Sequence, residues 1–225
     1  MKPFGTSGIA LGLTLLWVPA NAKEFENLDF ESGVPSGLHD VVVSGVHVQA
    51  GDAAKMLPGW QVKYDGVVTT SVFYDSNSGG VSGGMTLSEN SAPRFQTFYG
   101  RYSLFVWAAL NFPDQDPGGR TMSISQVGVI PRDAVGLRYN STNIHLDVLV
   151  NGQPLESREG YAGEEFADLR KFAGSEVELT FSFQPFYIGR FDSVEFTSVP
   201  EPSSFALLVG GMSVVLLEVR RRRKS

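Results

Sequence analysis

The chain contains no cysteine among its 225 residues. This absence excludes a disulfide framework, a thiolate zinc site and a cysteine nucleophile. It does not assign a reducing compartment, because many exported bacterial proteins also lack cysteine. With 42% apolar residues the chain can bury a hydrophobic core, so its composition is not that of a disordered protein.

Basic residues are scarce outside the C-terminal end. Residues 23–199 hold 22 of the 24 acidic residues but only 12 of the 18 basic ones, which leaves this segment near −10. An acidic segment of this kind repels phosphate backbones, so we expect no nucleic-acid partner. The acidic side chains are either a solubilising surface or include calcium ligands.

Sequence motifs of common catalytic sites are missing. There is no Gly-x-Ser-x-Gly elbow, His-Glu-x-x-His pair or phosphate-binding loop, and the three histidines, His39, His47 and His145, are scattered. His145 lies between apolar residues of an alternating run and is predicted to face solvent. Carboxylate pairs for glycoside hydrolysis meet in space and not in sequence, so that alternative stays open. We expect a protein that is not an enzyme.

The first 22 residues have the pattern of a secretory signal peptide. Lys2 precedes an apolar stretch over residues 9–18, which is too short to span a bilayer, and Ala20 and Ala22 form a small-x-small cleavage site. We therefore predict export and cleavage by signal peptidase after Ala22. The alternative is a buried N-terminal helix.

The opposite end combines a short apolar run with a basic tail. Residues 205–219 are nearly all apolar, and residues 220–224 are four arginines and a lysine. As a helix the run spans roughly 22 Å at 1.5 Å per residue, which is short for a hydrocarbon core of ~30 Å. The basic tail is expected to stay cytoplasmic. One interpretation is an ordinary single-helix tail anchor, about residues 204–219.

The order of features in residues 199–225 resembles the PEP-CTERM sorting signal of exopolysaccharide-producing Gram-negative bacteria. The motif Val199-Pro200-Glu201-Pro202-Ser203-Ser204 precedes the apolar run and the basic tail, and only Glu218 departs mildly from the pattern. The resemblance implies recognition by exosortase, a transient stay in the inner membrane and release to the cell surface or extracellular matrix. Whether the helix is removed from the mature protein stays open.

Residues 23–198 show no helix-period stretch of any length. Short alternating runs such as 60–64, 101–110, 120–130 and 176–183 are separated by turn residues and predict an all-β, antiparallel β-sandwich. Asn151-Gly152 predicts a tight hairpin turn. One short helical turn is expected within residues 164–174, with Gly174 ending it.

Several phrases of this segment resemble jelly-roll carbohydrate-binding modules and related galactose-binding-like domains. They are "NLDFESGVPSG" (27–37), "LPGWQV" (57–62) and "GRFDSVEF" (189–196). The resemblance implies a jelly roll whose first and last strands pair and hold a structural calcium ion. The matching positions are Asp29, Glu31 and Asp192, and the alternative is that these acids cap turns or face solvent.

Aromatic residues near predicted loops are the candidates for stacking on sugar rings. These are Tyr74, Tyr99 and Tyr187, whereas Trp60 and Trp107 are predicted to lie in the core. Together these features predict an exported, non-catalytic module of a biofilm matrix that binds exopolysaccharide or another glycan. The alternatives are a polysaccharide-active hydrolase or lyase on the same export route, and a purely structural or adhesive module.

Overall fold

The fold is described by a computed structural model over residues 23–43, 46–75, 84–89, 100–107, 121–160, 163–185 and 187–198. The predicted signal peptide with Ala20 and Ala22, and the predicted sorting signal over 199–225, lie outside these residues. Within the part of the chain that is described, no helix is long and apolar enough to cross a membrane. The helix predicted over about 204–219 belongs to the part that is not described.

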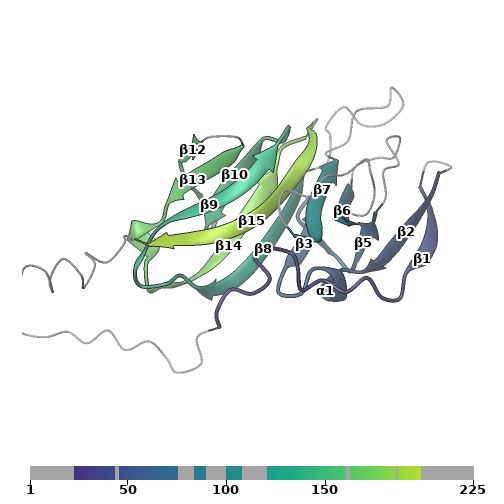
Figure 1. Cartoon of the computed structure of the whole chain (residues 1–225), viewed down its shortest axis with the longest axis horizontal. Coiled ribbons are helices and arrows are strands. Elements are labelled where there is room, and N and C mark those ends of the chain that lie inside the picture. Colours follow the sequence, from purple (N-terminus) through teal and green to yellow (C-terminus); the bar gives the residue numbers. More distant parts are fainter. Residues whose placement is uncertain are drawn as a thin grey trace, which may run out of the picture.

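Two β-sheets make up most of the described chain (Figure 1). The larger, sheet A, has nine strands in the spatial order β1 (His39–Val43), β2 (Val46–Asp52), β5 (Ser71–Tyr74), β6 (Gly84–Glu89), β7 (Tyr102–Trp107), β15 (Ile188–Ser198), β9 (Ala134–Thr142), β13 (Glu164–Asp168) and β12 (Ser157–Glu159). Sheet B has six strands in the order β11 (Gln153–Pro154), β10 (Leu146–Val150), β14 (Glu176–Phe183), β8 (Met122–Val129), β3 (Gln61–Tyr64) and β4 (Val67–Thr69).

The predicted all-β architecture is confirmed, with one correction to its antiparallel pairing. Strands β5 and β6 pair in parallel, with Phe73 opposite Thr86, while the other described strand pairs are antiparallel. Parallel neighbours need a longer connection than a hairpin, which agrees with the long glycine-rich segment between β5 and β6. The Asn151-Gly152 turn is confirmed, since both residues have positive φ and join β10 to β11.

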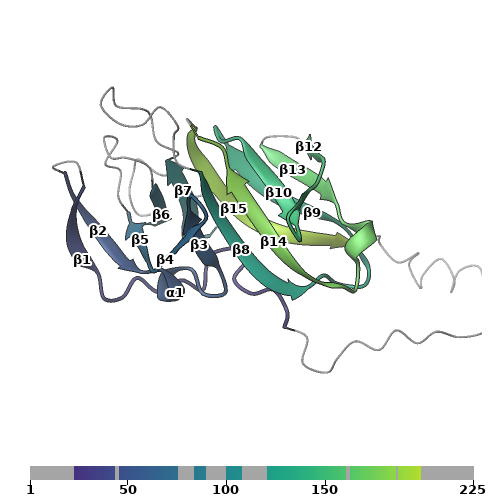
Figure 2. The same cartoon turned by 180° about the vertical axis from the view of Figure 1, so that it is seen from behind.

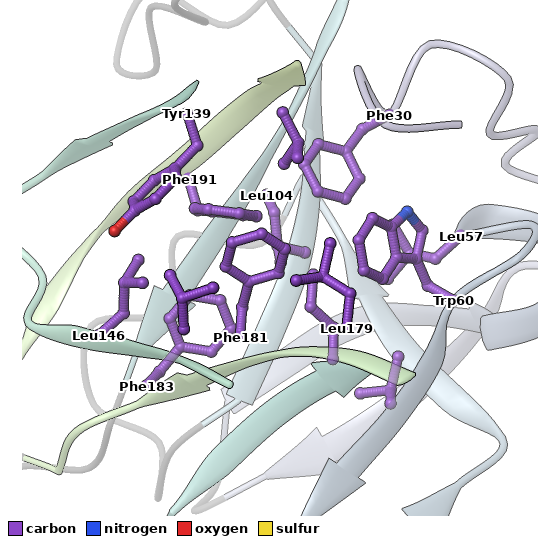
Figure 3. Packing of buried hydrophobic residues seen from close by; sticks show 14 of the residues in the cluster. Phe30, Leu57, Trp60, Leu104, Tyr139, Leu146, Leu179, Phe181, Phe183 and Phe191 are labelled. Atoms are coloured by element: carbon purple, nitrogen blue, oxygen red, sulfur yellow. The ribbon is translucent and has the colours of Figure 1, made fainter. Parts of the chain in front are cut away.

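A continuous aromatic core holds the two sheets face to face (Figure 3). Phe181 of sheet B lies 4.5 Å from Phe191 of sheet A, measured between ring centroids, and 5.6 Å from Tyr139. Trp60 and Phe30 extend the cluster toward the N-terminal segment. The alternation of strand β14 explains this placement, because every second residue points inward and is buried. Full burial of each such side chain contributes about 1.5–3 kcal/mol.

Both ends of the described chain lie at the same end of the sandwich. The Lys23 carbonyl accepts a hydrogen bond from the Val129 amide over 2.9 Å. The Phe25 ring packs on Phe196 of β15 with centroids 5.3 Å apart. The Gln126 side chain binds the backbone of Glu26 on both sides, accepting from its N–H and donating to its C=O. The N-terminal segment is therefore part of the folded body.

The short helical turn expected within residues 164–174 is confirmed as one 3-10 turn, η1 (Arg170–Phe172), after which Gly174 has a positive φ. The residues ahead of it form strand β13, which the sequence did not predict. Pairing of β13 with β9 outweighs the local helix preference of this segment. The sequence patterns also missed the β1–β2 hairpin and the single helical turn α1 (Ala53–Met56), which Asp52 caps by accepting from the Ala54 amide.

Candidate functional site

The structure does not bring the three predicted calcium ligands together. Among the described residues, which include all three acids, no group of three or more metal-ligating side chains is placed to hold a metal ion. Asp29 accepts a hydrogen bond from the Glu31 amide, 3.2 Å away. Asp192 is fully buried on β15 and accepts from the amide of Ser193 over 2.7 Å.

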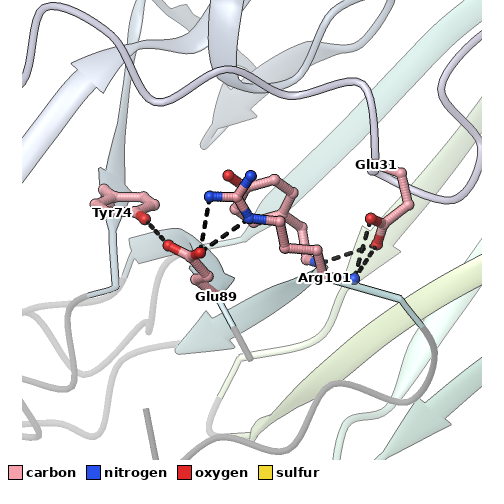
Figure 4. A network of polar contacts seen from close by, with 5 residues as sticks. Glu31, Tyr74, Glu89 and Arg101 are labelled. Atoms are coloured by element: carbon pink, nitrogen blue, oxygen red, sulfur yellow. Dashed lines mark hydrogen bonds and ion pairs between the residues drawn. The ribbon is translucent and has the colours of Figure 1, made fainter. Parts of the chain in front are cut away.

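Glu31 has a different partner from the one expected. Its carboxylate accepts hydrogen bonds from the backbone amides of Arg101 and Tyr102 at 2.8–3.0 Å, at the start of β7 (Figure 4). Gly100 makes this approach possible, because a Cβ at that position would lie 2.2 Å from the carboxylate oxygen. This carboxylate therefore serves to attach the N-terminal segment to β7, which is the physical reason that it is not available as a ligand.

Tyr74, one of the predicted sugar-stacking residues, belongs to a hydrogen-bond network beside that attachment (Figure 4). Its hydroxyl donates to Glu89, whose carboxylate also accepts from the Arg101 guanidinium at 2.9 Å. Burial, reinforced by Glu89, raises the pKa of Tyr74. The hydrogen bonds from Tyr74 and then Arg101 lower the pKa of Glu89. The ring of Tyr74 packs against the main core, so it is not a free platform.

Tyr187, another of the predicted tyrosines, is not part of that network. Tyr187 is 46% exposed and lies beside His145, with ring centroids 5.9 Å apart. His145 is exposed, as predicted. Tyr99 lies outside the described residues. The sequence-predicted residues that can be located thus do not form one site.

Trp107 is buried, but on the side of sheet A that faces away from the main core. Along β7 the residues Tyr102, Leu104 and Val106 enter the core between the sheets, whereas Phe105 and Trp107 form a separate cluster. The two rings make an edge-to-face contact with centroids 4.7 Å apart. The predicted burial of Trp107 is confirmed, but in a small cluster separate from the main core, because a strand presents two faces and both faces of β7 are buried.

Three hydroxyl side chains accompany this aromatic pair. Thr86, Ser88 and Ser103 are fully buried, and none has a hydrogen-bond partner within the described structure. Cross-strand register places them on the same face as the rings, since Thr86 is opposite Phe105 and Ser88 is opposite Ser103. We call these five residues the outer β6–β7 surface.

Strand β15 continues this surface on its other side. Arg190 lies opposite Phe105, and Ile188 lies opposite Trp107. Burial lowers the pKa of the Arg190 guanidinium, which places a partly desolvated cation next to the aromatic pair. The surface thus combines flat rings, hydroxyl groups and one positive charge.

Chemically, the outer β6–β7 surface suits binding better than catalysis. A buried hydroxyl without a partner costs roughly 1–3 kcal/mol, so each of the three gains from a hydrogen-bonding ligand or water. Hydroxyls can both donate and accept, and aromatic rings offer a flat apolar surface. These are the two features that a sugar ring needs, because it presents hydroxyls at its edge and C–H groups on its faces.

A second hollow lies at β11 and η1. It has a volume of about 400 Å³ and is lined by Gln153, Pro154, Leu155, Glu156, Asp168, Lys171 and Phe172. The carboxylate of Asp168 is bound by the Arg170 guanidinium, and these hydrogen bonds lower its pKa to about 2. No unpartnered buried polar side chain lines this hollow among the described residues, so it is the weaker candidate.

The outer β6–β7 surface was visible in the sequence only as a period-two pattern. In "YSLFVW" and "GMTLSE" the alternate residues are serine, threonine or aromatic, while the intervening ones are mostly aliphatic. Comparison with known proteins adds no assignment, since no protein-family model, curated protein or solved structure matches the chain.

Proposed function

We propose that the protein is an exported, non-catalytic glycan-binding module that a PEP-CTERM/exosortase system sorts to the cell surface or extracellular matrix. Its jelly-roll-like sandwich binds exopolysaccharide through the outer β6–β7 surface, whose residues are at most 9% exposed in the unliganded chain and become accessible on binding. The observation that carries the binding part is the row of buried, unpartnered hydroxyls at Thr86, Ser88 and Ser103 beside the Phe105–Trp107 pair.

The chemistry of this surface supports a polymer ligand with many hydroxyl groups. Each of the three hydroxyls acquires a partner when sugar hydroxyls replace water, while the rings of Phe105 and Trp107 cover apolar C–H faces. A hydroxyl-rich exopolysaccharide is therefore the preferred ligand class.

Binding is tested with the purified full chain on the exopolysaccharide of its host. Trp107→Ala and Ser103→Ala are expected to weaken binding by about tenfold or more, which corresponds to about 1.4 kcal/mol. Ser182→Ala is the matched control, because Ser182 is half-buried on β14 in the other sheet. Equal affinity of all variants would overturn the assignment of the surface.

Catalysis is tested in the same samples. Release of reducing ends from the polymer, abolished by a carboxylate substitution, would replace the binding module with a polysaccharide-active enzyme. Failure of every glycan to bind would favour a purely structural or adhesive module instead. Phe172→Ala distinguishes the two candidate sites. It should weaken glycan binding only if the ligand lies in the hollow at η1, because Phe172 lines that hollow.

Sorting is tested separately through the motif Val199-Pro200-Glu201-Pro202. Replacing Pro200, Glu201 and Pro202 by alanine is expected to retain the protein in the inner membrane fraction. Loss of the host's exosortase should have the same effect. Unchanged release in both strains would indicate that the C-terminal segment is an ordinary membrane anchor and not a sorting signal.

A further inference from the structure

The two sheets have four edges, and three of them are poor templates for another strand. In sheet B, β11 has two residues and includes Pro154, and β4 has three residues. In sheet A, β12 has three residues and carries Arg158 at its centre. Short length, proline and charge are the devices by which proteins prevent edge-to-edge association.

The fourth edge, β1, is longer, and Asp40 is its one carboxylate. It has five residues, His39–Val43, with no proline, lysine or arginine, and it ends in three valines. Val42 is 62% exposed, and Val46 in the paired strand is 39% exposed. Strand β1 is at the far end of sheet A from β12, as Figure 2 shows, and no described strand pairs with its outer side.

We propose that β1 is a self-association edge, at which it pairs antiparallel with β1 of a second copy of this chain. The two nine-stranded sheets then join into one sheet across a two-fold axis. This interaction is independent of the proposed glycan binding, and it brings two outer β6–β7 surfaces into one particle. Two linked sites on one polymer raise the apparent affinity through effective concentration.

The sequence of β1 is complementary to itself in this arrangement. Full overlap of five residues on five places Val41 opposite Val41, Asp40 opposite Val42 and His39 opposite Val43. No two charges of the same sign then face each other. Asp40 is also hydrogen-bonded to Gln49 within its own hairpin, which reduces its tendency to repel the second copy.

Strand β12, at the opposite edge of sheet A, is not suited to pairing with a second copy of itself. Antiparallel self-pairing of β12 places Arg158 opposite Arg158, and like charges directly opposite each other are destabilising. The two ends of sheet A are therefore not equivalent, and association through β1 closes as a dimer. A symmetric contact that uses the same surface on both copies ends there and does not extend into a fibre.

The absence of cysteine gives a direct test. In a Val41→Cys variant of the full chain, each copy carries a single thiol. Directly opposite residues of antiparallel strands have Cβ atoms about 4.5–5.5 Å apart, close to the spacing of a disulfide. Mild oxidation is expected to give a disulfide-linked dimer on a non-reducing gel.

Val68→Cys is the matched control, because Val68 is exposed at 51% on the three-residue edge strand β4. It should form little dimer at the same protein concentration. A mixture of Asp40→Cys and Val42→Cys chains should form the mixed disulfide in preference to either homodimer, which tests the register. Adding Val42→Asp to Val41→Cys places a second carboxylate opposite Asp40 of the other copy and should lower the dimer yield about tenfold.

Equal cross-linking of Val41→Cys and Val68→Cys would overturn the proposal. So would a Val41→Cys chain that stays monomeric while its thiol reacts readily with maleimide, since the edge is then free in solution. Insensitivity of the dimer to Val42→Asp would also contradict pairing through β1. Glycan binding by monomer and dimer is measured in parallel, so that failure of one proposal is distinguished from failure of the other.

Discussion

Both faces of strand β7 are buried, yet their side chains differ in chemistry and in hydrogen bonding. Leu104 and Val106 on the inner face join an aromatic and aliphatic core that contains members of both sheets. On the outer face, Ser103, Phe105 and Trp107 lie beside two further hydroxyl residues of β6, and the hydroxyls have no partner in the described structure. Burial alone therefore does not identify a core, whereas burial together with hydrogen-bond satisfaction does.

The largest expected effect is on the free energy of unfolding, through the core that the inner face of β7 joins. Phe181→Ala removes a ring that contacts Trp60, Tyr139 and Phe191 from the opposite side of the core. We expect the free energy of unfolding to fall by about 3–5 kcal/mol. Chemical denaturation of the purified protein measures this, with Phe181→Leu as the milder control. A loss below about 1 kcal/mol would contradict the assignment of the inner face as the main core.

Glu31 tests how the inner face is attached to the N-terminal segment. Glu31→Ala leaves the amides of Arg101 and Tyr102 without their shared acceptor. We expect a loss of about 1–3 kcal/mol in the same denaturation experiment. Addition of calcium should not change the unfolding midpoint of the wild type, because these acids do not form a metal site. A calcium-dependent rise that Glu31→Ala abolishes would restore the calcium hypothesis.

Glu89 should give a smaller effect, and one that depends on pH. Its pKa is lowered in the folded state by hydrogen bonds from Tyr74 and Arg101. The carboxylate therefore stabilises the fold above its ordinary pKa, and this contribution disappears as the pH falls through the lowered value. We expect Glu89→Gln to cost less than about 1 kcal/mol near neutral pH and almost nothing in acid. A pH-independent difference would indicate packing instead.

Among these variants, Ser103→Ala should change the free energy of unfolding least. It therefore contrasts most clearly with variants of the inner core. Removing an unpartnered buried hydroxyl costs no hydrogen bond, so Ser103→Ala should leave the free energy of unfolding within about 0.5 kcal/mol of wild type, or slightly raise it. The same variant is expected to lose affinity for the polymer. A large loss of stability would show that Ser103 is structural.

Sequence patterns predicted the sandwich well where alternation and turn chemistry agree. The run 176–183 has its aromatic and aliphatic residues at every second position, and Asn151-Gly152 tolerates positive φ at both residues, so strand, face and turn follow from local physics. The short helical turn within 164–174 is confirmed as η1, whereas the strand at 164–168 forms through its pairing with β9. Nothing local encodes that partner.

The candidate site was harder to predict, because its parts meet only through sheet topology. Trp107 and Ser103 lie on one strand, but Thr86 joins them through the β6–β7 pairing and Arg190 through the β7–β15 pairing. The acids predicted as calcium ligands are not grouped in the described structure, for a related reason. The acidic positions were matched by resemblance, whereas the carboxylate of Glu31 is occupied by backbone amides that are 70 residues away in sequence.

The contact between Phe25 and Phe196 has a consequence for how the fold can be rearranged. Since the first and last described segments touch, a short peptide can connect residue 198 to residue 23 without crossing the body. New ends opened in the Asn151-Gly152 turn would then give a circularly permuted sandwich with the same strand pairs. By the same geometry the body can be inserted into a surface loop of a host protein, entering and leaving at one place.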